Sequence, residues 1–181
     1  MSQSSKDRLG LDDFILELAK APAESITLER LADCGQRLTL SDELVSSHSR
    51  FRDDTYTRNL VCRTTRFELL VLCWQPGQRS TIHDHGGALN VTRVHSGTLT
   101  SRLFSVQPAQ PAVLVSEETL ERGGLTCVDR DQIHQLANES DRDLVTVHVY
   151  APPLRDITVY SAESAESEQV RLRYTLADDF A

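Results

Sequence analysis

The sequence lacks any long hydrophobic run, and this argues against a helical membrane span. Its longest apolar segment, residues 67–74, is far shorter than the roughly 20 residues that cross a bilayer as a helix. The N-terminal residues MSQSSKDRLG contain no apolar stretch of the kind found in secretory signals. We therefore expect a protein that does not associate with membranes and that resides in the cytoplasm.

Positive charge is also scarce. The chain has 19 Lys and Arg residues against 27 Asp and Glu residues, which gives a net charge of -8. Proteins that bind nucleic acids neutralise phosphates with a basic surface, and no basic cluster is visible in the sequence. We expect no nucleic-acid partner.

Cysteine pairs at short spacing are missing. The four cysteines, Cys34, Cys62, Cys73 and Cys127, are scattered and form no CxxC motif, which argues against a disulfide framework and against a zinc ribbon. We expect Cys73 and Cys127 to be small buried residues on strands.

The chain has the size and composition of one globular domain. It has 181 residues, of which 39% are apolar and 25% charged. In the first fifty residues apolar side chains recur at helical spacing. They predict a helix capped by Asp12, a second helix that starts after Ser25 or Thr27 and ends near Gly35, and a third that starts at Ser41.

Beyond residue 56 the pattern changes to short apolar runs separated by turn residues. We predict strands over Phe67–Trp74, Val91–Val94, Thr98–Val106, Val113–Val115, Leu125–Val128, Leu144–Tyr150 and Ile157–Tyr160. Residues 161–169 are polar and predicted to be a loop, followed by one more strand or a tail. Short strands with regular turns, such as the one at Ser96-Gly97, are typical of an all-β sandwich or barrel. We therefore predict one structural domain, with an N-terminal helical cap at residues 1–50 and a β-barrel at residues 51–181.

Three histidines form a candidate metal site. His83 and His85 stand two residues apart on an extended segment, so both imidazoles project to the same face. His134 follows in a second segment, just before a predicted strand. Imidazole suits iron, copper, nickel or zinc, so the ligands alone do not name the metal. Three ligands on one side of an octahedral ion leave up to three positions open for a substrate and oxygen.

The spacing around these histidines resembles the two motifs of the cupin superfamily. The matching residues are Gly77, His83, His85, Gly97, His134 and Asn138. The resemblance implies a cupin-type β-barrel, or jelly roll. Asn90 stands where cupins usually carry a glutamate ligand, and Asp129 and Asp131 replace the usual proline and glycine. These departures imply a neutral site of three histidines.

Three further stretches resemble the cysteine dioxygenase family more specifically. They are Tyr56–Val61 (YTRNLV), Leu72–His85 (LCWQPGQRSTIHDH) and Thr146–Pro153 (TVHVYAPP), and they cover roughly residues 50–155. The resemblance implies Fe(II) as the cofactor and a small thiol and O2 as the substrates. It implies dioxygenation of L-cysteine to cysteine sulfinic acid.

The same resemblance implies roles for residues outside the metal site. Arg58 matches the arginine that binds the substrate carboxylate, a task for which its planar fork of donors is suited. Tyr150 matches the active-site tyrosine and His148 its hydrogen-bonding partner. Thr146 stands where the family has a serine. Asn90 stands where animal members carry a cysteine crosslinked to the tyrosine, and we expect its amide to face the substrate.

Other interpretations remain open at this point. The substrate could be another small thiol, such as 3-mercaptopropionate. The chain could instead be a cupin that binds a metal or metabolite without turnover, or a zinc or nickel isomerase or lyase. We expect His95 to lie outside the metal site and Trp74 to be a packing residue beside it. The oligomeric state, monomer or small homo-oligomer, is not fixed by the sequence.

Overall fold

The computed structural model describes residues 8–175 and contains two antiparallel β-sheets beneath a layer of helices. The helices are α1 (Leu11–Ala19), α2 (Leu28–Arg37) and α3 (Asp42–Ser47), with a short 3-10 turn at Ala23–Ser25. Sheet I contains, in spatial order, β1 (Thr57–Arg63), β2 (Glu68–Trp74), β9 (Leu144–Ala151), β4 (Leu89–Ser96) and β7 (Leu125–Val128). Sheet II contains β11 (Ser167–Arg171), β10 (Asp156–Tyr160), β3 (Ile82–His83), β8 (Ile133–Ala137), β5 (Leu99–Ser105) and β6 (Val113–Leu120).

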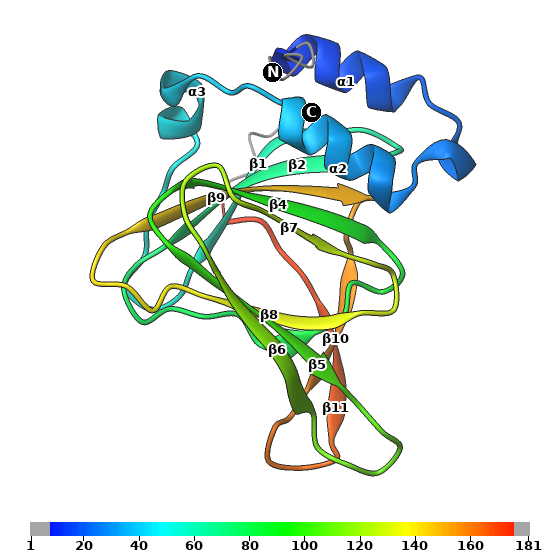
Figure 1. Cartoon of the computed structure of the whole chain (residues 1–181), viewed down its shortest axis with the longest axis vertical. Coiled ribbons are helices and arrows are strands. Elements are labelled where there is room, and N and C mark those ends of the chain that lie inside the picture. The colour runs from blue at the N-terminus through cyan, green and yellow to red at the C-terminus, as the bar shows by residue number, and fades with distance from the viewer. Residues whose placement is uncertain (1–7, 176–181) are drawn as a thin grey trace, which may run out of the picture.

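The two sheets face each other, and the helices cover the outer face of sheet I (Figure 1). Helix α2 packs on β4 and β7. This arrangement confirms the predicted all-β barrel with an N-terminal helical cap, while the domain boundary at residue 50 stays a prediction. None of the helices within residues 8–175 combines the length and the apolar character that crossing a membrane requires.

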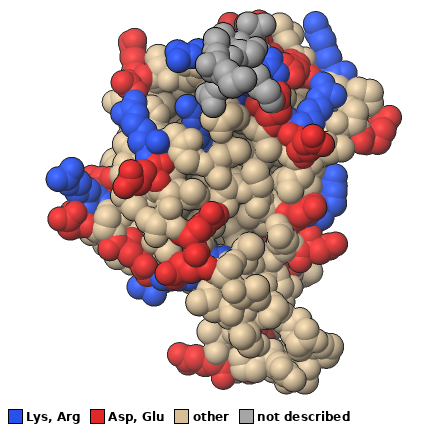
Figure 2. Space-filling model, in the orientation of Figure 1, with Lys and Arg blue, Asp and Glu red and all other residues tan. Residues whose placement is uncertain are grey.

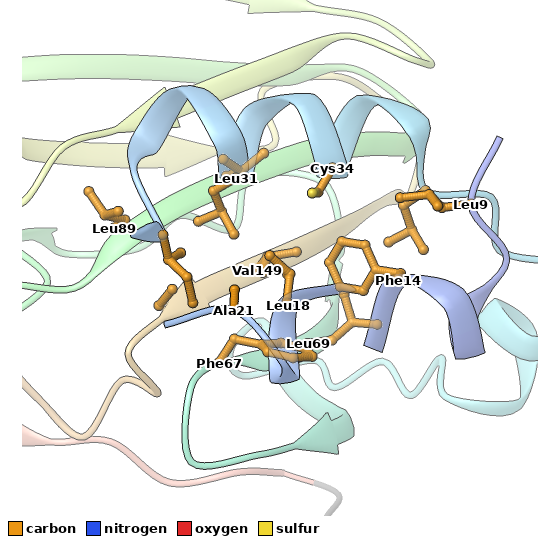
Figure 3. Packing of buried hydrophobic residues seen from close by; sticks show 14 of the residues in the cluster. Leu9, Phe14, Leu18, Ala21, Leu31, Cys34, Phe67, Leu69, Leu89 and Val149 are labelled. Carbon is orange, nitrogen blue, oxygen red and sulfur yellow. The ribbon is translucent and has the colours of Figure 1, made fainter. Parts of the chain in front are cut away.

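Strand β2 is buried on both faces, and this explains its almost continuous apolar sequence. Leu69 points outward to the helices, where it belongs to the same cluster as Phe14, Leu18 and Phe67 (Figure 3). Leu70 belongs to the cluster between the sheets. A strand with two covered faces needs no polar alternation, so only its length and flanking turn predict it.

The helix boundaries follow local hydrogen bonding. Ser41 caps α3 as predicted, since its Oγ accepts from the backbone N–H of Leu44 at 3.1 Å. The cap predicted at Asp12 is wrong, because α1 already begins at Leu11 and Asp12 lies in its first turn. There its negative charge interacts favourably with the positive end of the helix dipole.

The second helix also differs from the prediction, because it continues past Gly35 to Arg37. A Cβ at Gly35 would lie 2.8 Å from a methyl group of Val91 on β4. Gly35 therefore permits close packing of α2 on sheet I and does not end the helix.

The strand predictions fail mainly where a strand has little apolar alternation. Strand β6 extends to Leu120, beyond the predicted end at Val115. It is an edge strand that projects with β5 away from the barrel, so every residue from 113 to 119 is exposed and the sequence shows no apolar alternation there (Figure 1). Strand β11 occupies part of the predicted loop at residues 161–169. Strands β1, β3 and β8 are absent from the predicted set, and His134 lies within β8, not before it. The predicted turn is present, with Gly97 at φ +85°.

The surface carries both signs of charge. On the face in Figure 2, Lys and Arg side chains lie among Asp and Glu side chains over the upper part of the molecule. The lower projection carries fewer charges, and Val113, Leu114 and Val115 of β6 are 57%, 49% and 64% exposed. These apolar side chains of β6 therefore lie outside the hydrophobic clusters that cover the two faces of sheet I.

We predict that the helical layer is held mainly by Phe14, whose ring meets Phe67 edge-on at 5.6 Å between centroids. A Phe14→Ala substitution should lower the free energy of unfolding by about 3–5 kcal/mol, because it leaves a cavity under a layer that cannot fully collapse. Urea denaturation measures this change. Leu16→Ala, on the exposed side of the same helix, is the control and should change stability by about 0.5 kcal/mol or less. Equal effects of the two substitutions would contradict the assignment.

Candidate metal centre

Three histidines converge between the two sheets. His83 on β3 pairs in register with His134 on β8, and His85 follows two residues after His83. One nitrogen from each ring can be chosen so that all three lie within 4.8 Å of one another. The Nε2 atoms of His85 and His134 are 3.0 Å apart, which is the closeness expected of two ligands that share an ion.

The rings are neutral and correctly oriented for metal binding. His83 Nδ1 donates to the carbonyl oxygen of Thr81 at 2.9 Å, so its Nε2 lone pair is free. Burial lowers the pKa of His83 to about 4 and holds the pKa values of His85 and His134 well below their ordinary range. Three buried neutral imidazoles with converging nitrogens fit a divalent transition metal.

Asp84 fixes the loop between the first two histidines. Its Oδ1 accepts the backbone N–H groups of Gly86 and Thr158, each at 3.0 Å, and its Oδ2 accepts the hydroxyl of Tyr160 at 2.9 Å. Partial burial would raise the pKa of Asp84, but these hydrogen bonds outweigh it and hold the pKa below the ordinary value. Gly86 has φ +55°, and a Cβ there would lie 2.7 Å from a backbone oxygen of Asp156, so the turn requires glycine.

A chain of hydrogen bonds lies on the inward face of sheet I. Thr146, His148 and Tyr150 alternate along β9 and point to one side, as the sequence spacing predicted. Thr146 Oγ1 is 2.8 Å from His148 Nε2, and the hydroxyl of Tyr150 is 3.2 Å from His148 Nδ1. The indole of Trp74 donates to Thr146 Oγ1 at 2.9 Å, so Trp74 takes part in the chain as well as in packing.

The direction of these hydrogen bonds can be derived. The hydroxyl of Thr92 donates to Asn90 Oδ1, so its oxygen accepts from His148 Nδ1. Nε2 of the ring then accepts the hydroxyl proton of Thr146, whose oxygen accepts the indole N–H of Trp74. Burial holds the pKa of His148 well below its ordinary value, so the ring is neutral and carries its single proton on Nδ1. That N–H is shared between the hydroxyl oxygens of Tyr150 and Thr92, the latter at 3.0 Å. The hydroxyl proton of Tyr150 is therefore free to be donated to a ligand.

Tyr150 connects this chain to the histidines. Its ring meets that of His85 edge-on at 5.2 Å between centroids. Burial raises the pKa of Tyr150 to about 12, with the nearby Arg58 acting in the opposite direction. The phenol is therefore protonated at neutral pH and can act as a hydrogen-bond donor beside the metal site.

Arg58 lies at the same place. It is a buried residue of β1, and its guanidinium carbon is 5.5 Å from the centre of the Tyr150 ring. Its Nη2 is 3.8 Å from Oε1 of Glu68, the first residue of β2. The structure thus brings Arg58, Tyr150, His148 and Thr146 together opposite the three histidines.

Asn90 also lies on the inward face, but its amide contacts the protein. Its Nδ2 donates to the carbonyl oxygen of Val149 at 3.2 Å, and its Oδ1 accepts the hydroxyl of Thr92 at 3.0 Å. A role for Asn90 in binding substrate stays a prediction. His95 lies elsewhere, with its Nε2 3.2 Å from Asp42, outside the histidine cluster as expected.

The sequence interpretation missed Thr92 and Glu68. Thr92 stands two residues after Asn90, so strand alternation already placed both on one face. Glu68 is the single charged residue in the otherwise apolar segment Phe67–Trp74, and a buried charge is the exception that demands a partner.

An open groove of about 1550 Å³ reaches the edge of the site at His85. It is lined by residues after β9 and by the C-terminal part of β1, among them Leu60, Arg63, Arg155 and Tyr174, and it reaches His85. A small molecule can therefore approach the histidine cluster from this side of the barrel.

The buried histidines predict acid lability of the metal-free protein. An unfolded chain has imidazole pKa values near 6.5, so it binds more protons than the folded chain between about pH 4 and 6.5. Stability is therefore complete above this window and is lost as the pH falls through it. His83 alone should cost about 2 kcal/mol between pH 7 and 5.

Denaturant unfolding of metal-free protein at several pH values measures this loss. His134→Gln, which removes one of the buried imidazoles, should make the dependence on pH shallower. A parent protein that is equally stable at pH 7 and pH 5 would contradict the prediction.

Comparison with solved structures supports the architecture. A protein from Thermus thermophilus superposes with a TM-score of 0.53 at 20% identity, covering 63% of this chain and 97% of its own. An uncharacterized conserved protein with a double-stranded β-helix domain from Klebsiella pneumoniae gives a TM-score of 0.50 at 21% identity, covering 63% of this chain and 84% of its own. At this identity the likeness shows the cupin-type fold alone.

Comparison of sequences is more specific. Cysteine dioxygenase type 1 of Rattus norvegicus is 27% identical over 132 residues, which are 70% of this chain and 66% of the rat protein. The match to the family described as cysteine dioxygenase type I spans residues 39–163, well over half of the chain, and includes the three histidines, Arg58 and Tyr150. The chain therefore belongs to the cysteine dioxygenase type I family.

Proposed function

We propose that this protein is an Fe(II)-dependent thiol dioxygenase that converts L-cysteine and O2 to cysteine sulfinic acid. The observation that carries the proposal is the opposition of two groups across the barrel. Three neutral imidazoles converge from β3, its following loop and β8, and Arg58 and Tyr150 face them from β1 and β9. Family membership supports the same activity.

Ferrous iron held by His83, His85 and His134 would supply open coordination positions for a thiolate and dioxygen and would mediate electron transfer between them. The overall reaction balances without a further reductant, since both oxygen atoms of O2 are incorporated and the sulfur supplies the electrons. The protein contributes orientation and local polarity.

Arg58 would bind the substrate carboxylate. Its Nε and Nη2 atoms are buried and have no hydrogen-bond partner in the part of the chain that the structure describes. Buried donors of this kind are costly unless a ligand accepts from them, and a carboxylate matches their planar geometry. Tyr150 would donate its free hydroxyl proton to the substrate carboxylate or to bound oxygen, held in place by His148 and Thr146.

A reducing compartment suits this chemistry. The four cysteines are all free, which agrees with a cytoplasmic location, where thiols and ferrous iron are kept reduced. We include that location in the proposal.

Oxygen uptake tests the proposed reaction. Protein loaded anaerobically with Fe(II) should consume one O2 for each L-cysteine and release the sulfinate, detected by mass spectrometry. A His134→Gln variant should lose this activity together with stoichiometric iron. Oxygen uptake with 3-mercaptopropionate alone would shift the assignment to another thiol. Ligand binding without oxygen uptake for any thiol would refute the dioxygenase.

The carboxylate role of Arg58 has its own test. Arg58→Ala should raise KM for L-cysteine by about 10- to 100-fold, the value of one or two charge-assisted hydrogen bonds. The KM for cysteamine, which has no carboxylate, should change little. Arg102→Ala, which removes a partly buried arginine of β5 ion-paired with Glu117 and Glu139, is the control. A parallel rise in KM for both thiols would show that Arg58 does not recognise the carboxylate.

A further inference from the structure

A buried carboxylate stands beside the proposed carboxylate-binding arginine. Glu68 is 0% exposed, and its Oε1 lies 3.8 Å from Nη2 of Arg58. Among the described residues, Glu68 Oε1 and Arg58 Nε and Nη2 are buried polar atoms without any hydrogen-bond partner. The two side chains thus form a long ion pair that leaves one acceptor and two donors without a hydrogen bond.

The orientation of Glu68 is fixed from behind. Its Oε2 accepts the hydroxyl of Tyr174 at 2.5 Å, and that hydroxyl in turn accepts from Nη1 of Arg63 at 3.0 Å. On the other side Glu68 is the direct cross-strand neighbour of Tyr150 on β9. The carboxylate is therefore held with one oxygen anchored and the other directed toward Arg58, next to the tyrosine that faces the histidines.

The two charges decide what can bind. Arg58 alone would make the pocket attractive to any thiol that carries a carboxylate. As a charged carboxylate, Glu68 would offset this charge and place a negative group 3.8 Å from the guanidinium that would hold the substrate carboxylate. A ligand with a carboxylate and no positive group therefore meets repulsion, whereas a zwitterion can satisfy Arg58 with its carboxylate and Glu68 with an N–H group.

We propose that Glu68 is a specificity-determining residue that makes this pocket select thiols carrying both an amine and a carboxylate over thiols carrying a carboxylate alone. The inference rests on the proposed function and goes beyond it by naming a residue that sets the preference for L-cysteine over thiols without an amine. The pKa of Glu68 is raised overall, because burial, the largest influence, outweighs the hydrogen bond from Tyr174 and the charge of Arg58, which act in the opposite direction.

L-Cysteine and 3-mercaptopropionate test the proposal, because they share a thiol and a carboxylate and differ in the amine. In the parent protein KM should be lower for L-cysteine. In Glu68→Gln, which preserves shape and removes the charge, the ratio of KM for 3-mercaptopropionate to KM for L-cysteine should fall about tenfold, with kcat for each thiol changing less. Glu118→Gln, an exposed position on β6, is the matched control and should leave the ratio unchanged.

Binding without turnover provides an independent measurement. Trp74 is the only tryptophan, and it stacks on Tyr56 at 4.2 Å and hydrogen-bonds to Thr146 beside the site. Its fluorescence should report anaerobic dissociation constants for both thiols on Fe(II)-loaded protein. The ratio of the dissociation constant of 3-mercaptopropionate to that of L-cysteine should fall in Glu68→Gln as the KM ratio does. This measurement tests the inference even if the parent oxidises neither thiol. Absence of oxidation would refute only the proposed reaction.

A second variant covers the case in which Glu68→Gln does not fold. Tyr174→Phe removes the hydrogen bond that stabilises the charged carboxylate and lies near the C-terminal end of the described chain. It should shift the ratio in the same direction by a smaller factor. A ratio unchanged in whichever of these folded variants is measured would overturn the proposal.

Discussion

The site depends on one constraint, which is the burial of three imidazoles between two sheets. In water these rings would be protonated for part of the time, and protonated rings repel both one another and a cation. Inside the barrel desolvation keeps them neutral, and the pairing of β3 with β8 holds two of them in register. The helical layer supports this indirectly, because it covers the outer face of sheet I and allows that sheet to be apolar on its outer side.

The two sheets have different tasks. Sheet II and the loop fixed by Asp84 supply the three histidines of the candidate metal site. Sheet I supplies the charged and hydrogen-bonding groups from β1, β2 and β9. A substrate bound between the sheets, as we propose, would contact both, so the distance between the sheets, which the core packing controls, would set its orientation.

Part of this arrangement could be predicted from the sequence. The HxH spacing and the alternation along Leu144–Tyr150 specify which side chains share a face, because the alternation of side chains is a local property of extended backbone. The bounds of β6 and β11 could not be predicted, because exposed strands carry no apolar alternation. The roles of Glu68 and Thr92 also escaped prediction, since each depends on a neighbour from a distant strand that a single sequence does not bring together.

Thr146 shows how one methyl group can affect a hydrogen-bonded chain. Its β-branched side chain is more restricted at χ1 than a serine would be, and it is 0% exposed on a strand packed on both faces. The hydroxyl group is consequently held between the Trp74 indole and the His148 ring without the rotational freedom that a serine hydroxymethyl group retains. The entropy of ordering this donor is thus lost once, when the chain folds, and not again each time a ligand binds.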